Sequence, residues 1–508
     1  MKNAVIMMHA TVGAMSIINR SSRYMHILLN RRCISSSSST SLPFLPPPAT
    51  LVSTAISAAS LLSQTPVLYA RCSALQAADF AIQHLKVSPG SRCLVLTSPR
   101  GGPRAGSLLA SLRRRGFAPL ALALPDVSPS LTHASLAAAA ARRAGATWVI
   151  GVGGAATIAV ARGTAMILGG NNNINSSNGS MMNDPSVPLL SVPSCPSGAE
   201  LTRDALLFDT SAGLTSMKMH PKSLQAAVCD SEIAASLEGE ASVTIYYSLL
   251  IHSLEIFLRT LGDDSARAQA WFALEMAARS LQIAVEGGNN SSSTASSSVS
   301  ARSARDAATA ASVLVGSAML LGPLGPARST ALAIASRYSI SYSAALTAVA
   351  PAAISASLEL LLDTVETERE EREEEDGDIV VGLCEATLSR YALAGQLLSQ
   401  VVSRDKSSTS FMWSNINDVL QQQKSENNDS GEIVKSASLL VPALIQLRNT
   451  LAISGGLANG TQTLEDFGLS ETDLSAIADV AELLDDNTTI ASFAALRRAD
   501  FSRILQES

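Results

Sequence analysis

Short apolar runs alternate with helical stretches between residues 92 and 168, and no other feature of this 508-residue chain constrains the fold as strongly. Apolar runs of this kind predict buried strands, and parallel strands need crossover helices between them. The alternation therefore predicts a βαβαβ unit with a parallel sheet. Strands are expected over residues 92–97, 119–124 and 147–152, and helices over 106–115, 131–144 and 157–168.

A glycine-rich turn, Gly153-Gly154-Ala155-Ala156, stands between the third expected strand and the following helix. Such a turn lets backbone amides approach a pyrophosphate, and the helix N-terminus adds partial positive charge. A glycine pair in this position also makes a plain tight connection. The turn is therefore a candidate dinucleotide site, with the plain connection as the alternative.

From about residue 242 onward, apolar residues recur at helical period and the strands vanish. We predict an α/β + all-α architecture, with a Rossmann-like parallel-sheet nucleotide domain over residues 46–240 and a C-terminal helical-bundle domain over 241–508. Enzymes built in this way usually place the reaction in the cleft between the domains. The expected helices span residues 242–259, 265–286, 305–321, 327–362, 383–402 and 437–453.

The N-terminal segment has a charge pattern of its own, because residues 1–78 contain no Asp or Glu. Spaced arginines, apolar clusters and a serine tract are typical of an organelle transit peptide, which we predict over residues 1–45. Arg31-Arg32-Cys33 resembles a mitochondrial processing site, so a mitochondrial location is expected. A plastid address, or a tail without any address, is the alternative.

Composition excludes several classes of protein. With 47% hydrophobic and 16% charged residues, the chain is globular. A net charge of −6 and 4% aromatic residues argue against nucleic-acid binding, which needs a basic surface and stacking platforms. Residues 42–70 are apolar but broken by prolines and hydroxyl side chains, so no transmembrane helix and no membrane partner are expected. The expected partner is a small-molecule substrate, and the small-residue helix faces would allow a homodimer.

Six scattered cysteines without a CxxC pair exclude a zinc ribbon or a disulfide framework and fit a reducing compartment. Polar, low-complexity stretches interrupt the apolar pattern and are expected to be surface insertions. They span residues 169–186, 287–303, 366–378 and 403–432.

The order and spacing of these features resemble the iron-containing (group III) alcohol dehydrogenases, relatives of glycerol dehydrogenase and dehydroquinate synthase, from about residue 92 to the C-terminus. Residues 147–167, TWVIGVGGAATIAVARGTAMI, look like the family's strand, glycine turn and helix, and residues 191–202, SVPSCPSGAELT, look like its second cofactor loop. The resemblance implies a dehydroquinate synthase-like fold and an oxidoreductase that uses NAD or NADP to interconvert a small alcohol and an aldehyde, ketone or oxoacid. The cofactor contacts it implies are Ser98, Gly153, Gly154, Ala155, Ala156, Ser194, Cys195 and Lys218.

The family's metal ligands are matched poorly. They are an Asp and a His one turn apart on one helix, followed by further histidines. Here Ser248 stands in place of the Asp and His252 remains, while Arg328 and Tyr342 stand at later histidine positions. One imidazole cannot hold a divalent ion against water, so iron or zinc is doubtful. The resemblance thus implies a degenerate metal site in which His252 is the only surviving ligand type.

The nucleotide half departs from the family as well, since Ala156 and Ala159 replace a serine and an acid of the glycine loop. Ser98 is followed by Arg100 and Arg104. These arginines could bind the 2′-phosphate of NADP, or they could be solvated side chains of a surface turn, so the sequence does not decide between NAD and NADP as the cofactor. The missing acid, a shortened second loop and the replaced metal Asp are shared with the maleylacetate reductase branch of the family. That branch keeps its histidines, so the resemblance to it is partial.

The remaining side chains suggest a metal-free hydride-transfer site. Arg328 is a permanent cation that could polarise a carbonyl oxygen, Tyr342 could donate a proton, and His252 could orient it or act as an alternate donor. Purely structural roles for all three residues are the alternative. A catalytically inactive descendant that serves as a binding or assembly module also remains open, because function resides in the site and not in the fold.

Overall fold

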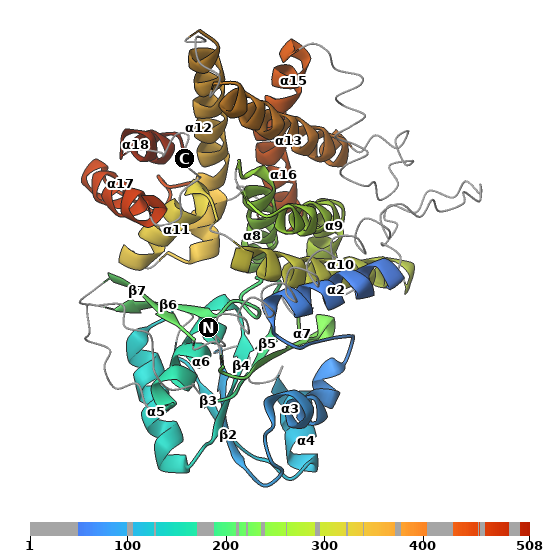
Figure 1. Cartoon of the computed structure of the whole chain (residues 1–508). Helices are drawn as coiled ribbons and strands as arrows, with labels where there is room; N and C mark the ends of the chain where they lie inside the picture. Colours follow the sequence, from blue (N-terminus) through green and yellow to red (C-terminus); the bar gives the residue numbers. More distant parts are fainter. Residues whose placement is uncertain are drawn as a thin grey trace, which may run out of the picture.

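The structure is a computed structural model with two layers, a sheet domain and a helical domain packed above it (Figure 1). The predicted transit peptide, residues 1–45, lies outside the described part of the chain, as do Arg100 and Arg104. The described residues are 49–98, 105–125, 129–169, 187–209, 213–219, 222–234, 239–260, 262–289, 295–321, 324–338, 340–370, 377–403, 430–455, 457, 463–486 and 498–508.

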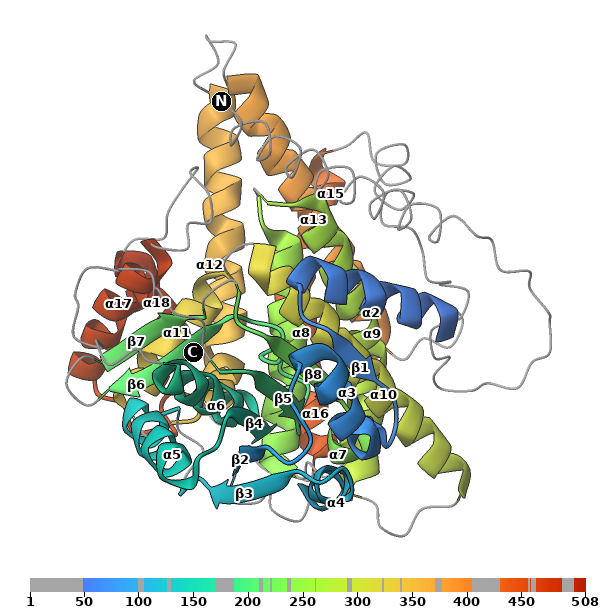
Figure 2. The ribbon, with the colours of Figure 1, turned by 60° about the horizontal axis from the view of Figure 1, so that its bottom comes forward.

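Six parallel strands form the central sheet in the order β1-β8-β5-β4-β2-β3, seen from below in Figure 2. β2 leads to β3 on one side, and the chain then returns to place β4 on the other side of β2. This reversal creates a topological switch point between β2 and β4, the usual place for a ligand in such sheets. The strands are β1 (Val67–Tyr69), β2 (Arg92–Thr97), β3 (Ala118–Ala123), β4 (Trp148–Gly153), β5 (Leu189–Pro193) and β8 (Gln225–Cys229).

Alternating side chains of the strands build two apolar layers. On β2, Cys93 and Val95 pack on one face with α3 and α4, while Leu94 and Leu96 pack on the other face with α5 and α6. This alternation follows from the two-residue period of a strand, and covering helices on both faces are what a parallel sheet requires. The helices are α3 (Ala77–Leu85), preceded by η1 (Ser73–Gln76), then α4 (Gly106–Arg114), α5 (Leu131–Ala144) and α6 (Ala155–Leu168).

An antiparallel hairpin, β6 (Asp204–Asp209) and β7 (Gly213–Lys218), leaves the sheet domain, and after β8 the described chain is helical. These helices share one large apolar core. They are α7 (Ser231–Ala234), α8 (Gly239–Leu258), α9 (Asp264–Asn289), α10 (Ala295–Ala318), η3 (Met319–Leu321), α11 (Pro326–Arg337), α12 (Tyr342–Glu370), α13 (Gly377–Ser403), α15 (Ser430–Ala437), α16 (Leu440–Ser454), α17 (Glu471–Asp486) and α18 (Arg498–Glu507).

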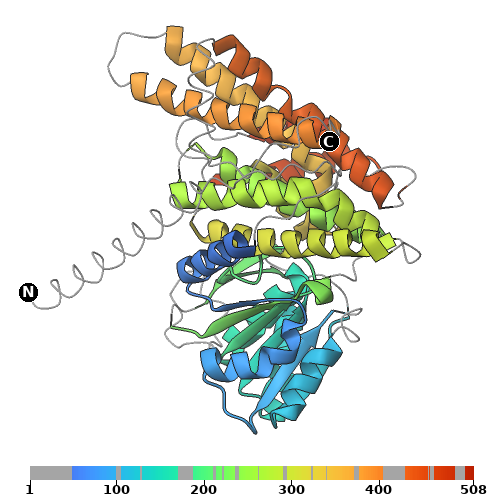
Figure 3. The same cartoon turned by 90° about the vertical axis from the view of Figure 1, so that its right-hand side faces the viewer.

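Helix α2 (Ala49–Ser63) precedes the sheet in sequence but packs with the helical domain. Figure 3 shows it lying along α10, between the sheet and the rest of the bundle. Val52, Ile56 and Ala59 belong to the core of the bundle, and Ser317 on α10 donates a hydrogen bond to the Ala59 carbonyl at 3.2 Å. The start of the described chain thus ties the two layers together.

The predicted fold class is confirmed, and three helix predictions need correction. The single helix expected over residues 327–362 is two helices, because Tyr338 leaves α11 in an extended conformation and the Ser341 side chain caps α12. The helix expected over 437–453 belongs to α16, with α15 ending at Ala437. The serine-rich stretch 287–303, expected as an insertion, supplies the first turns of α10 from Ala295 onward.

Four helices are long and apolar enough, by length and composition, to cross a bilayer. Their apolar windows are 89%, 72%, 67% and 39% buried within the protein. A helix that is apolar all round suits the interior of a bundle as well as a membrane. The prediction of no transmembrane helix concerned residues 42–70, which do not include these four helices. They are Glu240–Leu258, Val299–Leu321, Tyr342–Thr367 and Ile433–Ser454.

Candidate functional site

The carboxyl ends of β2, β4 and β5 meet at the switch point and bring together most of the predicted cofactor residues. The Ser98 amide donates to the Val152 carbonyl at 3.4 Å, and the Ser194 amide donates to the Gly153 carbonyl at 2.9 Å. Cys195 follows at once on the second loop. Residues from three separate segments therefore line one edge of the sheet.

The glycine turn is shaped by close approaches of its neighbours. A Cβ atom on Gly153 would lie 2.5 Å from Thr157 Oγ1, and one on Gly154 would lie 3.3 Å from Cys195 Sγ. Gly154 is the N-cap of α6 and makes no side-chain cap, while Ala155 is exposed and Ala156 half-buried. The first-turn amides of α6 thus lack partners within the helix and suit the phosphates of a dinucleotide.

Lys218, the remaining predicted cofactor contact, lies on a different element. It is the last residue of β7, it is exposed, and it stands opposite Asp204 in the hairpin register. Its predicted role in cofactor binding stays a prediction.

The four residues that the sequence resemblance aligns with metal ligands, Ser248, His252, Arg328 and Tyr342, lie on α8, α11 and α12. The closest contact joins His252 Nε2 and the Tyr342 hydroxyl at 2.8 Å, with the two rings 5.8 Å apart and stacked. Arg328 on the first turn of α11 is half-buried and is close enough to affect the pKa of both side chains. We call His252, Arg328 and Tyr342 the His252 cluster.

Burial dominates the electrostatics of the His252 cluster. His252 is 5% exposed, and burial together with the Arg328 cation lowers its pKa to about 3. Burial raises the pKa of Tyr342, while Arg328 acts in the opposite direction. The cluster at neutral pH is therefore an uncharged imidazole, an uncharged phenol and one guanidinium cation.

Glu255, one turn after His252 on α8, anchors the segment that carries Arg328. Its Oε1 accepts hydrogen bonds from the Ala327 amide at 3.0 Å and the Arg328 amide at 3.4 Å. A carboxylate at a helix N-terminus is favoured by the helix dipole. Glu255 thereby sets the first turn of α11 against α8.

The donor set does not fit iron or zinc. Ser248 donates its hydroxyl to the Thr244 carbonyl at 2.7 Å, and His252 Nε2 is engaged by Tyr342. The nearby Arg328 guanidinium would repel a dication. Within the described ranges, no group of three or more His, Cys, Asp or Glu side chains is placed to hold a metal.

A buried arginine that the sequence analysis did not single out supports the second cofactor loop. Arg162 on α6 is 1% exposed, and burial lowers its pKa to about 10. Its guanidinium donates to the carbonyls of Ala199 and Asp204, both at 2.8 Å, and to Thr202 Oγ1 at 3.1 Å. In the sequence, Arg162 is distinguished as the single charged residue of the apolar helical run 157–168.

The same loop is attached directly to the helical domain. Glu200 is fully buried, and its Oε1 accepts a hydrogen bond from Ser312 of α10 at 2.7 Å. Gly198 has φ +74°, and a Cβ on Gly316 of α10 would lie 2.3 Å from the Gly198 carbonyl oxygen. Backbone therefore touches backbone here, so the loop that carries Ser194 and Cys195 is held by both domains.

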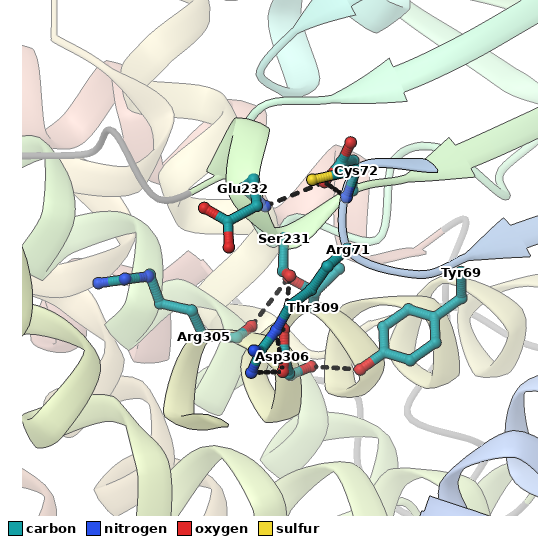
Figure 4. Close-up of polar contacts among 9 residues, drawn as sticks. Tyr69, Arg71, Cys72, Ser231, Glu232, Arg305, Asp306 and Thr309 are labelled. Atoms are coloured by element: carbon teal, nitrogen blue, oxygen red, sulfur yellow. Dashed lines mark hydrogen bonds and ion pairs between the residues drawn. The ribbon is translucent and has the colours of Figure 1, made fainter. Parts of the chain in front are cut away.

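A second joint between the domains is centred on Asp306 of α10 (Figure 4). Its carboxylate pairs with Arg71, which follows β1, and accepts a hydrogen bond from Ser231, which follows β8. The Tyr69 hydroxyl donates to the Asp306 carbonyl at 2.9 Å. The carboxyl ends of two neighbouring strands, β1 and β8, are thus tied to α10.

Comparison with known proteins supports the resemblance. Residues 72–231 match the family model described as iron-containing alcohol dehydrogenase. Among curated proteins, none matches the sequence of this chain. Solved structures share its fold at low identity. A 1,3-propanediol oxidoreductase has a TM-score of 0.65 and 17% identity, and the match covers 87% of this chain and 97% of that one.

Two further structures are similar across the same extent. The NADH-dependent butanol dehydrogenase A of Thermotoga maritima has a TM-score of 0.62 and 15% identity, covering 87% of this chain and 96% of that one. The maleylacetate reductase of Agrobacterium tumefaciens has a TM-score of 0.54 and 14% identity, covering 87% and 95%. These likenesses establish the two-domain fold.

Proposed function

We propose that the chain is an NAD(P)-dependent oxidoreductase without a resident metal, because residues 72–231 match the family model of iron-containing alcohol dehydrogenases and the whole chain shares its fold with a solved 1,3-propanediol oxidoreductase. Its substrate would be a small alcohol and the corresponding aldehyde, ketone or oxoacid. The observation that carries the proposal is the His252 cluster, where a cation and a hydroxyl donor stand at the family's ligand positions.

The glycine turn would hold the dinucleotide. Gly153 and Gly154 keep side chains away from the first-turn amides of α6, and Ser98, Ser194 and Cys195 flank them. When bound, a nicotinamide supplies hydride transfer at the carbonyl carbon. The thermotogal relative is named as NADH-dependent, which supports NAD for this chain.

The His252 cluster would act on the carbonyl oxygen. Negative charge grows on that oxygen during reduction, and the Arg328 guanidinium stabilises it as a fixed cation. The Tyr342 hydroxyl donates the proton that completes the alcohol. His252 with its proton on Nε2 donates to the Tyr342 oxygen and leaves the phenolic hydrogen for the substrate.

Turnover by the purified chain tests this function. NADH and NADPH oxidation is followed with a panel of small aldehydes, ketones and oxoacids in the presence of EDTA. We expect at least one substrate to turn over with EDTA present. Arg328→Ala should lose roughly 10²–10³ in kcat, the usual effect of removing one donor to a developing oxyanion. Undiminished turnover in Arg328→Ala would overturn the assigned role.

A catalytically inactive binding module is the second candidate, favoured by the simultaneous change of the serine and acid of the glycine loop and of the metal ligands. It predicts a folded protein that neither binds a nicotinamide nor oxidises one. Binding without turnover on the panel would keep the cofactor assignment and contradict the proposed substrates.

We also propose import into the mitochondrion, on the basis of the acid-free, arginine-bearing residues 1–45. Fusion of these residues to a fluorescent protein tests it. Mitochondrial fluorescence is expected, and plastid or cytosolic fluorescence would contradict the proposal.

A further inference from the structure

Three arginines from separate elements lie near one another where α8 ends and α9 begins: Arg259 directly after α8, Arg267 on α9 and Arg390 on α13. Arg390 of α13 donates to the Arg259 carbonyl at 2.8 Å, and a Cβ on Gly262 would lie 3.5 Å from Arg267 Nη1 and 3.8 Å from Arg259 Cδ. We call Arg259, Arg267 and Arg390 the arginine junction. Gly262, which is exposed and has no side chain, lies beside Arg259 and Arg267.

Two arginines of the junction, Arg267 and Arg390, carry buried guanidinium N–H groups that have no hydrogen-bond partner among the described residues. Arg390 is 8% exposed, and its Nε is buried without a hydrogen-bond partner in the described chain. Arg267 Nη1 is buried without a partner in the same ranges. An unpaired buried donor on a charged group costs free energy, so two of them at one place indicate a missing acceptor.

The charge around the junction is positive. Burial lowers the pKa of both Arg259 and Arg390 to about 10, and repulsion by Arg267 acts in the same direction on each. The nearby acids are Asp263, whose carboxylate accepts from the first amides of α9, Asp264, which pairs with Arg267 and is 93% exposed, and Glu255, which anchors α11. Neighbouring guanidinium cations with unpaired N–H donors, here Arg267 and Arg390, have the chemistry that recognises phosphate and carboxylate.

We propose that the arginine junction is a binding site for a small polyanion, either a phosphate ester or a polycarboxylate. The site is separate from the glycine turn, since it lies within the helical domain, on α9, on α13 and directly after the end of α8. Arg328 of the His252 cluster is close enough to affect the pKa of Arg259, so an anion bound here would lie in the electrostatic neighbourhood of the candidate active site.

Calorimetric titration of the full chain tests the proposal. The probes are inorganic pyrophosphate and citrate, at constant ionic strength set with chloride. Pyrophosphate binding identifies a phosphate site, citrate binding alone identifies a carboxylate site, and either result supports the proposal. No binding of either probe at millimolar concentration would overturn it.

Two variants locate the binding. Arg267→Gln removes one cation at a partly exposed position. Arg390→Lys keeps the positive charge but replaces the forked N–H donors of the guanidinium by a single ammonium group. Each should weaken binding by about tenfold or more, the effect of losing one charge-assisted hydrogen bond. Arg115→Gln, which breaks an exposed pair with Asp79 in the nucleotide domain, is the matched control and should bind as the parent does.

Pyrophosphate is also part of a dinucleotide, so binding at the glycine turn is the competing outcome. Affinity unchanged in both Arg267→Gln and Arg390→Lys would place the anion at that turn and overturn the junction site. If Arg390→Lys fails to fold, Arg267→Gln decides alone. Neither result depends on catalytic activity.

Discussion

The Tyr342 hydroxyl lies 2.8 Å from His252 Nε2, and the sequence resemblance aligns both residues with metal-ligand positions. This pairing engages the one imidazole that a metal would need and supplies a hydroxyl donor beside the Arg328 cation. His252, Tyr342 and Arg328 thus form a polar cluster of an imidazole, a phenol and a nearby guanidinium.

The first prediction concerns pH. The folded pKa of His252 is about 3, below the ordinary 6.5, so the unfolded chain binds a proton first as pH falls. The resulting stability is complete above pH 6.5 and is lost as pH falls from 6.5 towards 3. Between pH 7 and 5 the parent should lose about 2 kcal/mol more unfolding free energy than His252→Gln.

Urea denaturation at the two pH values checks this prediction. Equal losses in the parent and in His252→Gln would show that His252 titrates normally in the folded protein. A kcat/KM profile without an inflection near pH 6.5 is expected for the same reason.

A second prediction separates the two glycines of the turn. Gly153→Ala should lower the unfolding free energy by about 2 kcal/mol, since its methyl group would meet the Thr157 side chain and overpack a tight turn. The methyl group of Gly154→Ala would lie 3.3 Å from Cys195 Sγ, a tight contact but a less severe one than at Gly153, and this variant should cost less. Equal destabilisation of the two variants would contradict this account of the turn.

Much of the sheet domain could be predicted from sequence because its strands are buried on both faces. β2 and α5 have the predicted limits, and the Gly153-Gly154 turn lies where expected. β1 was not predicted, because a strand of three residues is too short to show a recognisable alternation of apolar and polar residues. The break between α11 and α12 escaped because apolar periodicity continues across residues 338–341 while the backbone turns.

The candidate site was predicted less completely. Resemblance identified His252, Arg328 and Tyr342, but periodicity does not reveal which side chains bond to each other. Arg162 and Asp306 gain their roles from segments far away in the sequence, the loop near residue 200 and the strand end at Arg71. Such partnerships exist only once the tertiary fold has formed.

The third prediction concerns Arg162. Arg162→Met should lower the unfolding free energy by about 3 kcal/mol, because it leaves the buried carbonyls of Ala199 and Asp204 without their donor. Chemical denaturation measures this, with the exposed Arg143→Met as the control, where a change within about 0.5 kcal/mol is expected. Similar effects of the two substitutions would show that the buried network contributes nothing specific.

The fourth prediction concerns the joint between the domains. A double-mutant cycle with Arg71→Ala and Asp306→Ala should give a coupling of about 1 kcal/mol or less, since both side chains are partly exposed and solvent screens the pair. The Arg115 and Asp79 pair, more exposed and within one domain, should couple more weakly. The reverse order would contradict a role for Asp306 in joining the domains.

The central claim is that this fold still binds a nicotinamide and works without a metal. Fluorescence titration of the protein without its first 45 residues, with NADH and NADPH in EDTA, tests it most directly. We expect micromolar binding of at least one of them, unchanged by EDTA. A folded sample that binds neither would show that the Gly153-Gly154 turn is only a turn and would contradict the proposed oxidoreductase.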